Sequence, residues 1–92
     1  MGREVVHELE IRNRLGLHAR AAAAFVKVAA HYRAEVTVEL DNAVVDGKSL
    51  LGLLTLGASQ GKRIRLRASG EMAEEVVAAL SGLVEGRFGE SQ

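Results

Sequence analysis

Hydrophobic and polar residues alternate along three stretches of this chain, which cover residues 5–12, 36–40 and 62–68. A repeat of two residues is typical of a strand that buries one face and exposes the other. A shorter apolar segment at residues 43–45 follows the turn-forming pair Asp41 and Asn42, so we expect it to form a hairpin with the preceding strand. The pattern therefore predicts four strands.

A second pattern, with apolar residues at helical spacing, fills the intervals between these strands. It predicts a helix over residues 19–32 and a short helix over residues 50–56. Ser49 precedes the short helix as an N-cap, and Gly57 ends it. A last helix follows Ser69, which can cap it, and carries acidic residues near its positive end.

The predicted elements follow the order βαββαβα. Each strand offers one apolar face and each longer helix one apolar stripe, so two layers can bury all of these surfaces. We therefore expect an α/β two-layer open-faced sandwich of the α+β type, built by a single domain over residues 1–92. Its ordered core should cover about residues 3–86, and the tail after Gly86 should fray.

Composition argues against several classes of partner. Twelve Lys and Arg residues balance 12 Asp and Glu residues, and aromatic residues make up only 3% of the chain. We expect no nucleic-acid partner, because the charge is balanced and few rings can stack on bases. We expect no membrane insertion, because the most apolar run contains Lys27 and is shorter than the roughly 20 residues that span a bilayer. A charged N-terminus and the absence of Cys predict a cytoplasmic protein.

One row of positive charge stands out on the outer face of the last predicted strand, at Arg63, Arg65 and Arg67. Acidic residues on the neighbouring strands can pair with this row, at about 0.2 to 1 kcal/mol for each cross-strand pair. An RNA-binding stripe is the alternative. We favour the ion pairs, because acidic residues share the face and no aromatic residue is interleaved with the arginines.

The stretch over residues 13–22, Asn-Arg-Leu-Gly-Leu-His-Ala-Arg-Ala-Ala, passes from a strand through a Gly-containing turn into a helix. His18 falls at the helix start, where free N–H groups and the positive end of the helix dipole can hold an anion. The same positive end favours the neutral, nucleophilic imidazole. Arg20 adds a guanidinium that suits phosphate oxygens. The spacing alone leaves an ordinary exposed or capping histidine as the alternative.

The other two histidines lack such a cluster of donors. His7 falls on the inward face of the first strand and His31 near the end of the first helix, so we expect structural roles for both. The three histidines are also dispersed, without the ligand spacing that a zinc site requires. We therefore predict no metal site.

Residues 13–22 are similar to the active-site motif of the HPr family of histidine phosphocarrier proteins. The segment Gly-Lys-Ser-Leu-Leu-Gly-Leu-Leu-Thr-Leu-Gly at residues 47–57 resembles the second signature of that family, and the interval from His18 to Ser49 matches its register. The family usually has Pro where this chain has Ala21. Pro in a first helical turn only removes an N–H that is unpaired anyway, so we expect Ala21 to affect the rigidity of the site more than its chemistry.

This resemblance implies a phosphoryl relay in the phosphoenolpyruvate-dependent phosphotransferase system. Enzyme I phosphorylates Nδ1 of His18, and His18 passes the group to IIA proteins or domains for sugar uptake, with Ala19 and Arg20 binding the phosphate. The resemblance also implies a four-stranded antiparallel sheet of order 1-4-2-3 and a stoichiometric carrier, not an enzyme. We expect a monomer without a cofactor. A nitrogen-related or purely regulatory branch of the same system is a second function that the residues leave open.

The second signature suggests two further roles. Ser49 is the predicted N-cap, and in many members of the family the matching Ser is phosphorylated, which would add a Ser kinase/phosphorylase to the partners. Leu50, Leu51 and Leu54 are too many for one short helix to bury. An exposed apolar patch beside a reactive residue is typical of a docking surface, so we expect these leucines to contact the partners.

Two functions of another class fit a small two-layer domain. A ligand-binding regulatory module would require glycine turns at a dimer interface. An acyl-phosphate hydrolase would require a phosphate loop that ends in a catalytic Arg with a partnering Asn. The sequence has neither feature, and we therefore favour the phosphocarrier.

Overall fold

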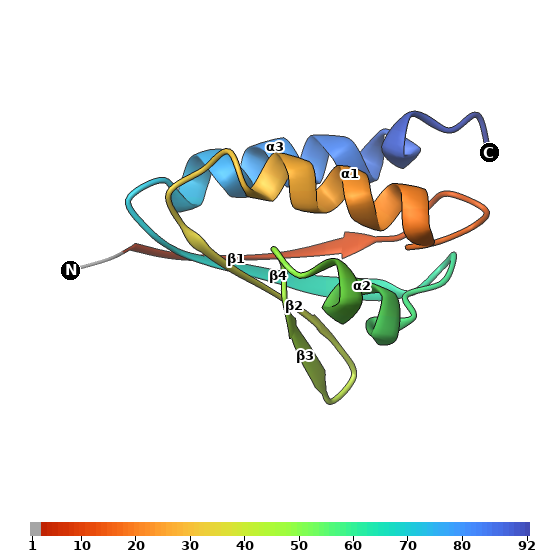
Figure 1. The fold of residues 1–92 in the computed structure, drawn as a ribbon, viewed down its shortest axis with the longest axis horizontal. Helices are drawn as coiled ribbons and strands as arrows, with labels where there is room; N and C mark the ends of the chain where they lie inside the picture. The colour runs from red at the N-terminus through yellow and green to blue at the C-terminus, as the bar shows by residue number, and fades with distance from the viewer. Residues whose placement is uncertain (1–2) are drawn as a thin grey trace.

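The computed structural model describes residues 3–92, so the first two residues of the predicted domain lie outside the described part. The elements follow the order that the sequence predicts (Figure 1). They are β1 (Arg3–Glu10), α1 (Ala19–Ala29), β2 (Glu35–Leu40), β3 (Ala43–Asp46), α2 (Leu50–Leu56), β4 (Arg63–Gly70), α3 (Ala73–Glu85) and a short 3₁₀ helix, η1 (Arg87–Gly89). The strands form one antiparallel sheet of order β1-β4-β2-β3, which confirms the expected fold.

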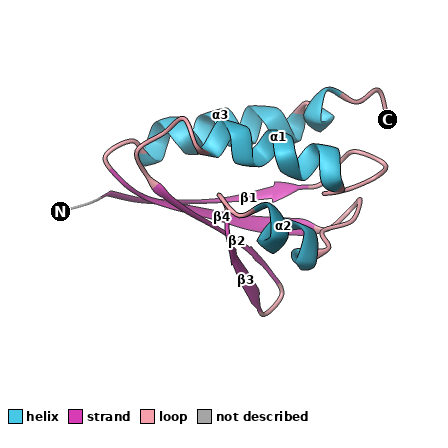
Figure 2. Cartoon of the chain, viewed as in Figure 1, coloured by secondary structure: helices cyan, strands magenta, loops and turns pink. Residues whose placement is uncertain are grey.

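The helices cover one face of this sheet, and α1 and α3 run side by side across it (Figure 2). The core lies between the two layers. Phe25 of α1 and Leu80 of α3 are fully buried there against Val38 and Leu66 of the two central strands. Leu53 anchors α2 to the same core, which places the short helix beside α1.

Charged residues line the opposite, outer face of the sheet. Arg65 and Arg63 both contact Glu8, with N–O distances of 3.2 and 3.6 Å, and Arg67 contacts Glu39 at 3.3 Å. Such exposed pairs contribute at most about 1 kcal/mol each. The arginine row therefore has the acidic partners that the sequence analysis favoured over an RNA-binding stripe.

The first helix ends earlier than the sequence predicts. α1 stops at Ala29, whereas the hydrophobic pattern predicts a helix that continues to residue 32. The ring of His31 contacts the Lys27 carbonyl oxygen at 2.7 Å, and the His31 N–H bonds instead to the carbonyl of Val28. The side chain therefore competes for the carbonyl that would continue the helix, and the chain turns back toward β2.

Ser69 does not cap the last helix, contrary to the prediction. It lies within β4 and pairs with Glu4 on one side and Glu35 on the other. α3 begins only at Ala73, and its N-cap residue is Met72, which makes no side-chain capping bond. β4 pairs with a strand on each side, and this pairing includes Ser69. Ser69 is therefore a strand residue, although its side chain is of the type that caps helices.

The tail after Gly86, which the sequence predicts to fray, contacts the loop that follows β1. Residues Arg87–Gly89 form η1, and the backbone N–H of Arg14 donates to the carbonyl of Gln92 at 3.0 Å. The end of the chain therefore packs beside the loop that follows β1 (Figure 1).

Gly16 shapes that loop. Its φ of 66° lies in the left-handed region, and a Cβ there would lie 2.6 Å from the Ala58 carbonyl oxygen and 2.9 Å from the Ser59 Cα. Leu17 donates to the same Ala58 oxygen at 2.9 Å, so the close approach of the two loops is part of the fold. Only a residue without a side chain fits both requirements.

We expect Gly16→Ala to lower the free energy of unfolding by about 2 to 3 kcal/mol, since it adds left-handed strain and a clash with backbone atoms. Gly61→Ala is the matched control, because Gly61 also has a positive φ of 89° but nothing lies within 4 Å of its Cβ position. Denaturant unfolding of both variants measures the difference. Equal losses in the two variants would contradict a role for the loop contact.

Candidate functional site

The loop between β1 and α1 is held by a buried asparagine. Asn13 is fully buried, and its Nδ2 donates to the Gly16 carbonyl at 2.8 Å and to Glu90 Oε1 at 3.0 Å. Both partners are acceptors, so the amide nitrogen must face them. Leu17 is also buried, and its backbone N–H donates to the Ala58 carbonyl. These contacts fix the backbone immediately before His18.

His18 is the N-cap residue of α1, as the sequence predicts, with an extended backbone at φ −77° and ψ −178°. Its carbonyl accepts the first helical hydrogen bond, from Ala22 at 2.8 Å, but its ring makes no capping bond. The ring Nε2 instead lies 2.6 Å from Glu90 Oε2. The side chain is 28% exposed, so one part of the ring faces solvent. His18 is therefore not a side-chain cap.

Glu90 accepts hydrogen bonds from two donors in different segments. The bond from His18, followed by the bond from Asn13, lowers the pKa of the Glu90 carboxyl below its ordinary value. The positive charges of protonated His18 and of Arg20 act in the same direction, and partial burial opposes them. Glu90 is therefore a carboxylate at neutral pH.

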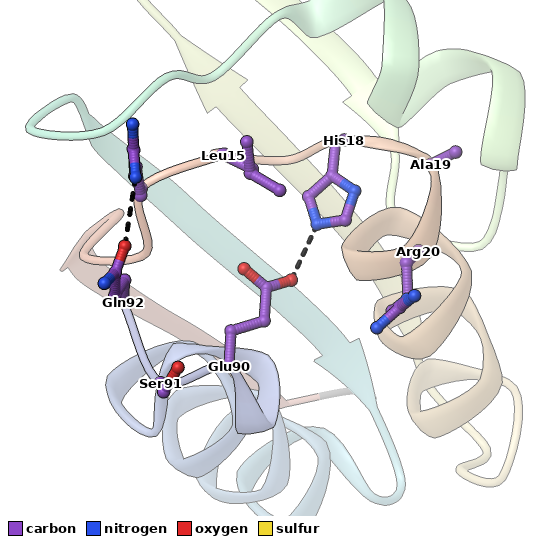
Figure 3. Close-up of a pocket in the computed structure, with 8 residues that line it drawn as sticks. Leu15, His18, Ala19, Arg20, Glu90, Ser91 and Gln92 are labelled. Carbon is purple, nitrogen blue, oxygen red and sulfur yellow. Dashed lines mark hydrogen bonds and ion pairs between the residues drawn. The ribbon is translucent and has the colours of Figure 1, made fainter.

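A cleft of about 640 Å³ opens beside the His18 ring. Figure 3 shows Glu90 reaching toward His18 from the tail, with Arg20 on the adjacent first turn of α1. Arg14 also lines the cleft and donates to the Gln92 side-chain oxygen at 3.1 Å. Two guanidinium groups and the free N–H groups of the α1 N-terminus thus surround the space next to the imidazole, which suits a small anion.

The second predicted segment forms α2 with the expected caps. The Ser49 hydroxyl accepts a hydrogen bond from the Gly52 N–H at 3.0 Å, and Gly57 ends the helix in the left-handed conformation. Leu53 is buried, whereas the three candidate docking residues are exposed, namely Leu50, Leu51 and Leu54. The bond between Leu17 and Ala58 joins the loop that follows α2 to the loop that carries His18.

The remaining histidines lie away from the cleft. His7 Nδ1 is 3.1 Å from the Ser81 hydroxyl of α3, which places the ring on the inward side of β1, and His31 contacts the Lys27 carbonyl. Residues 3–92 contain no group of three or more His, Cys, Asp or Glu side chains that could hold a metal ion. Within the same residues, no helix has the length and apolar character needed to cross a membrane.

Known proteins resemble the chain over nearly its whole length. Residues 5–86 match the family model of the PTS HPr component phosphorylation site. The chain belongs to the PTS HPr family. The phosphocarrier protein HPr of Neisseria meningitidis serogroup A is 42% identical to it over 84 residues, which cover 91% of this chain and 94% of that protein.

Solved HPr structures share the fold of this family member. The crystal structure of HPr-C-His from Thermoanaerobacter tengcongensis has a TM-score of 0.89 and 44% identity, covering 98% of this chain and 99% of that one. A phosphocarrier protein HPr from Bacillus anthracis has a TM-score of 0.85 and 33% identity, covering 88% and 96%. The resemblance seen in the sequence is thereby confirmed at the level of family and fold, and the roles of single residues stay predictions.

The sequence alone assigns no role to several residues of the site, among them Asn13, Leu15 and Glu90. Asn13 belongs to the motif, and its position in a turn was the only signal for it. Leu15, beside His18, is 66% exposed and lines the cleft. Glu90 carries no local signal, because it follows a Gly-containing tail that resembles a frayed end.

We expect the Glu90 contacts to stabilise the fold in a pH-dependent way. Because the folded-state pKa of Glu90 is lowered, its contribution is fully present above the ordinary value of about 4.3 and is lost as the pH falls through the folded value. The thermal midpoint of wild type should exceed that of Glu90→Ala at about pH 6, and the gap should close toward about pH 3. Gln92→Ala removes the tail contact to the Arg14 guanidinium, in which neither side chain changes protonation between about pH 3 and 6, so its gap should not close in this way.

Proposed function

We propose that this HPr-family chain carries a phosphoryl group on Nδ1 of His18. It accepts the group from phosphorylated enzyme I and passes it to IIA proteins or domains, in the cytoplasm and as a monomer. The chain is a stoichiometric carrier, because the same atom that receives the group gives it up. The observation that carries this proposal is the partly exposed His18 ring, which borders a cleft lined by Arg20 at the N-terminus of α1.

Ala19 and Arg20 hold the phosphoryl group in this proposal. Ala19 and Arg20 are the first two residues of α1, so their backbone N–H groups have no intrahelical partner and point toward the N-terminal end. Arg20 is exposed at the cleft, where its planar donors can contact phosphate oxygens during transfer. Negative charge at a helix N-terminus is stabilised by about 0.3 to 1 kcal/mol, and the guanidinium adds a charged hydrogen bond.

Leu50, Leu51 and Leu54 form the docking surface for both partners. Leu51 is 72% exposed, and the helix that carries these residues is anchored to the core by Leu53. When a partner docks, these exposed side chains become buried, and the carrier does not have to reorganise because the helix is already fixed. This favours a short-lived complex with more than one partner. Ser49, at the N-terminus of the same helix, is where a regulatory kinase would add negative charge beside the docking surface.

We expect His18→Ala to abolish phosphoryl transfer while the thermal midpoint stays within a few degrees of wild type. The ring lies at the surface of the cleft and not in the core, so its loss leaves no large cavity. Incubation with enzyme I and labelled phosphoenolpyruvate, followed by acid and base treatment, measures an acid-labile, base-stable label on His.

His31→Ala is the matched control for this experiment. His31 is exposed, lies just beyond α1 and bonds through its ring to the Lys27 carbonyl, so this variant should accept label at the wild-type rate. Retained labelling of His18→Ala would overturn the proposed function. Loss of labelling in His31→Ala as well would show that the assay reports folding and not the acceptor.

We expect Ser49→Asp to keep the thermal midpoint within a few degrees, because Asp is also a favourable N-cap residue. Transfer from enzyme I should weaken at least about tenfold, or about 1.4 kcal/mol, since the new charge repels an anionic donor site and must be desolvated on docking. Asn42→Asp adds the same charge in the exposed turn between β2 and β3 and should transfer normally. Equal rates for both variants would place the docking surface elsewhere.

A further inference from the structure

The His18 ring has two nitrogens, and only one of them can be the attacking atom. Nε2 lies 2.6 Å from Glu90 Oε2, within the range of a short charge-assisted hydrogen bond. A neutral imidazole carries its proton on one nitrogen and a lone pair on the other. The partner of Nε2 therefore decides which nitrogen is free to act as a nucleophile.

Glu90 can only be the acceptor in this contact. The hydrogen bonds from His18 and Asn13 keep its pKa below the ordinary value, so at neutral pH it is a carboxylate without a proton to donate. The Nε2 atom must then carry the proton. In the neutral ring, the lone pair is left on Nδ1.

The carboxylate is held in place by contacts on both sides of it. Asn13 Nδ2 donates to the second Glu90 oxygen at 3.0 Å, and Asn13 is itself buried and bonded to Gly16. Beyond Glu90, both the backbone N–H and the guanidinium of Arg14 bond to Gln92. The tail thus presents Glu90 to the ring in a fixed geometry, in the way that a carboxylate orients a histidine in other reactive sites.

We propose that Glu90 is a positioning residue that holds the proton on Nε2 of His18 and so presents Nδ1 to the phosphoryl group. This inference rests on the proposed function. It assigns a role to Glu90, beyond the segments that resemble the two family signatures, and to the contacts between the tail and the loop that follows β1.

The transfer step balances without any movement of the Nε2 proton. The Nδ1 lone pair forms the N–P bond while the bond from phosphorus to the leaving atom of the donor breaks, and the electron pair of that bond stays with the donor. The ring, still protonated on Nε2, becomes positively charged, and the adjacent carboxylate stabilises that charge. When an acceptor attacks phosphorus, the N–P electron pair returns to Nδ1 and the neutral ring is regenerated.

The experiment compares wild type with Glu90→Ala and Glu90→Gln in the full chain. NMR of protein labelled with ¹⁵N-histidine detects a directly bonded Nε2–H proton in slow exchange with water when the hydrogen bond is present. We expect this signal in wild type, its retention in Glu90→Gln, which keeps an acceptor oxygen, and its loss in Glu90→Ala. A change in folding alone would not separate the two variants in this order.

Transfer kinetics from enzyme I provide the second measurement. We expect the maximal rate to fall at least about tenfold in Glu90→Ala and by a smaller factor in Glu90→Gln, with little change in the concentration of half-saturation. Glu85→Gln removes the same charge from an exposed position of α3 and should match wild type.

The outcomes separate the two proposals. A protected Nε2–H signal that persists in Glu90→Ala, or a Glu90→Ala rate equal to that of wild type, would overturn the positioning role and leave the carrier function standing. Absence of label on His18 in wild type would overturn both. An ordered loss from wild type through Glu90→Gln to Glu90→Ala, with Glu85→Gln unchanged, supports the positioning role.

Discussion

The Glu90 carboxylate joins three parts of the chain that are remote in sequence. It accepts one hydrogen bond from Asn13 in the loop after β1 and one from His18 at the start of α1, while it belongs to the segment after η1. A carboxylate can only accept, so both partners must act as donors. The orientation of the ring, the position of the loop and the packing of the tail therefore depend on one another.

Groups of both charges lie beside the His18 ring. The cleft beside His18 suits an anion, because Arg14, Arg20 and the N-terminus of α1 border it, yet it also contains the negative charge of Glu90. Two hydrogen bonds occupy the Glu90 oxygens and reduce its repulsion of an anion such as the phosphoryl group of the proposed function. On the outer face of the sheet, arginines are paired with glutamates. The chain has no net charge, so attraction of an anion depends on this local cluster of donors.

The short helix α2 shows how few residues are needed to display an apolar surface. Ser49 caps the N-terminus of α2, Gly57 ends the helix, and Leu53 anchors it to the core. Leu50, Leu51 and Leu54 stay exposed and so lose the free energy of burial, about 1.5 to 3 kcal/mol for a full side chain. Their exposure is a cost to the carrier alone. In the proposed function, a partner covers this surface for part of the time.

The sequence by itself determined the order and type of the four strands and of α1, α2 and α3, the position of His18 at a helix start, the caps of α2 and the exposure of Leu50, Leu51 and Leu54. Those features depend on residues within a few positions of one another, where period and capping chemistry act. Tertiary structure decided that β4 continues through Ser69 to Gly70, because strand pairing overrode a local cap, and it decided where the tail packs. Glu90 contacts residues 72 and 77 positions earlier in the chain, and no local pattern encodes a contact that exists only after the sheet and helices have packed.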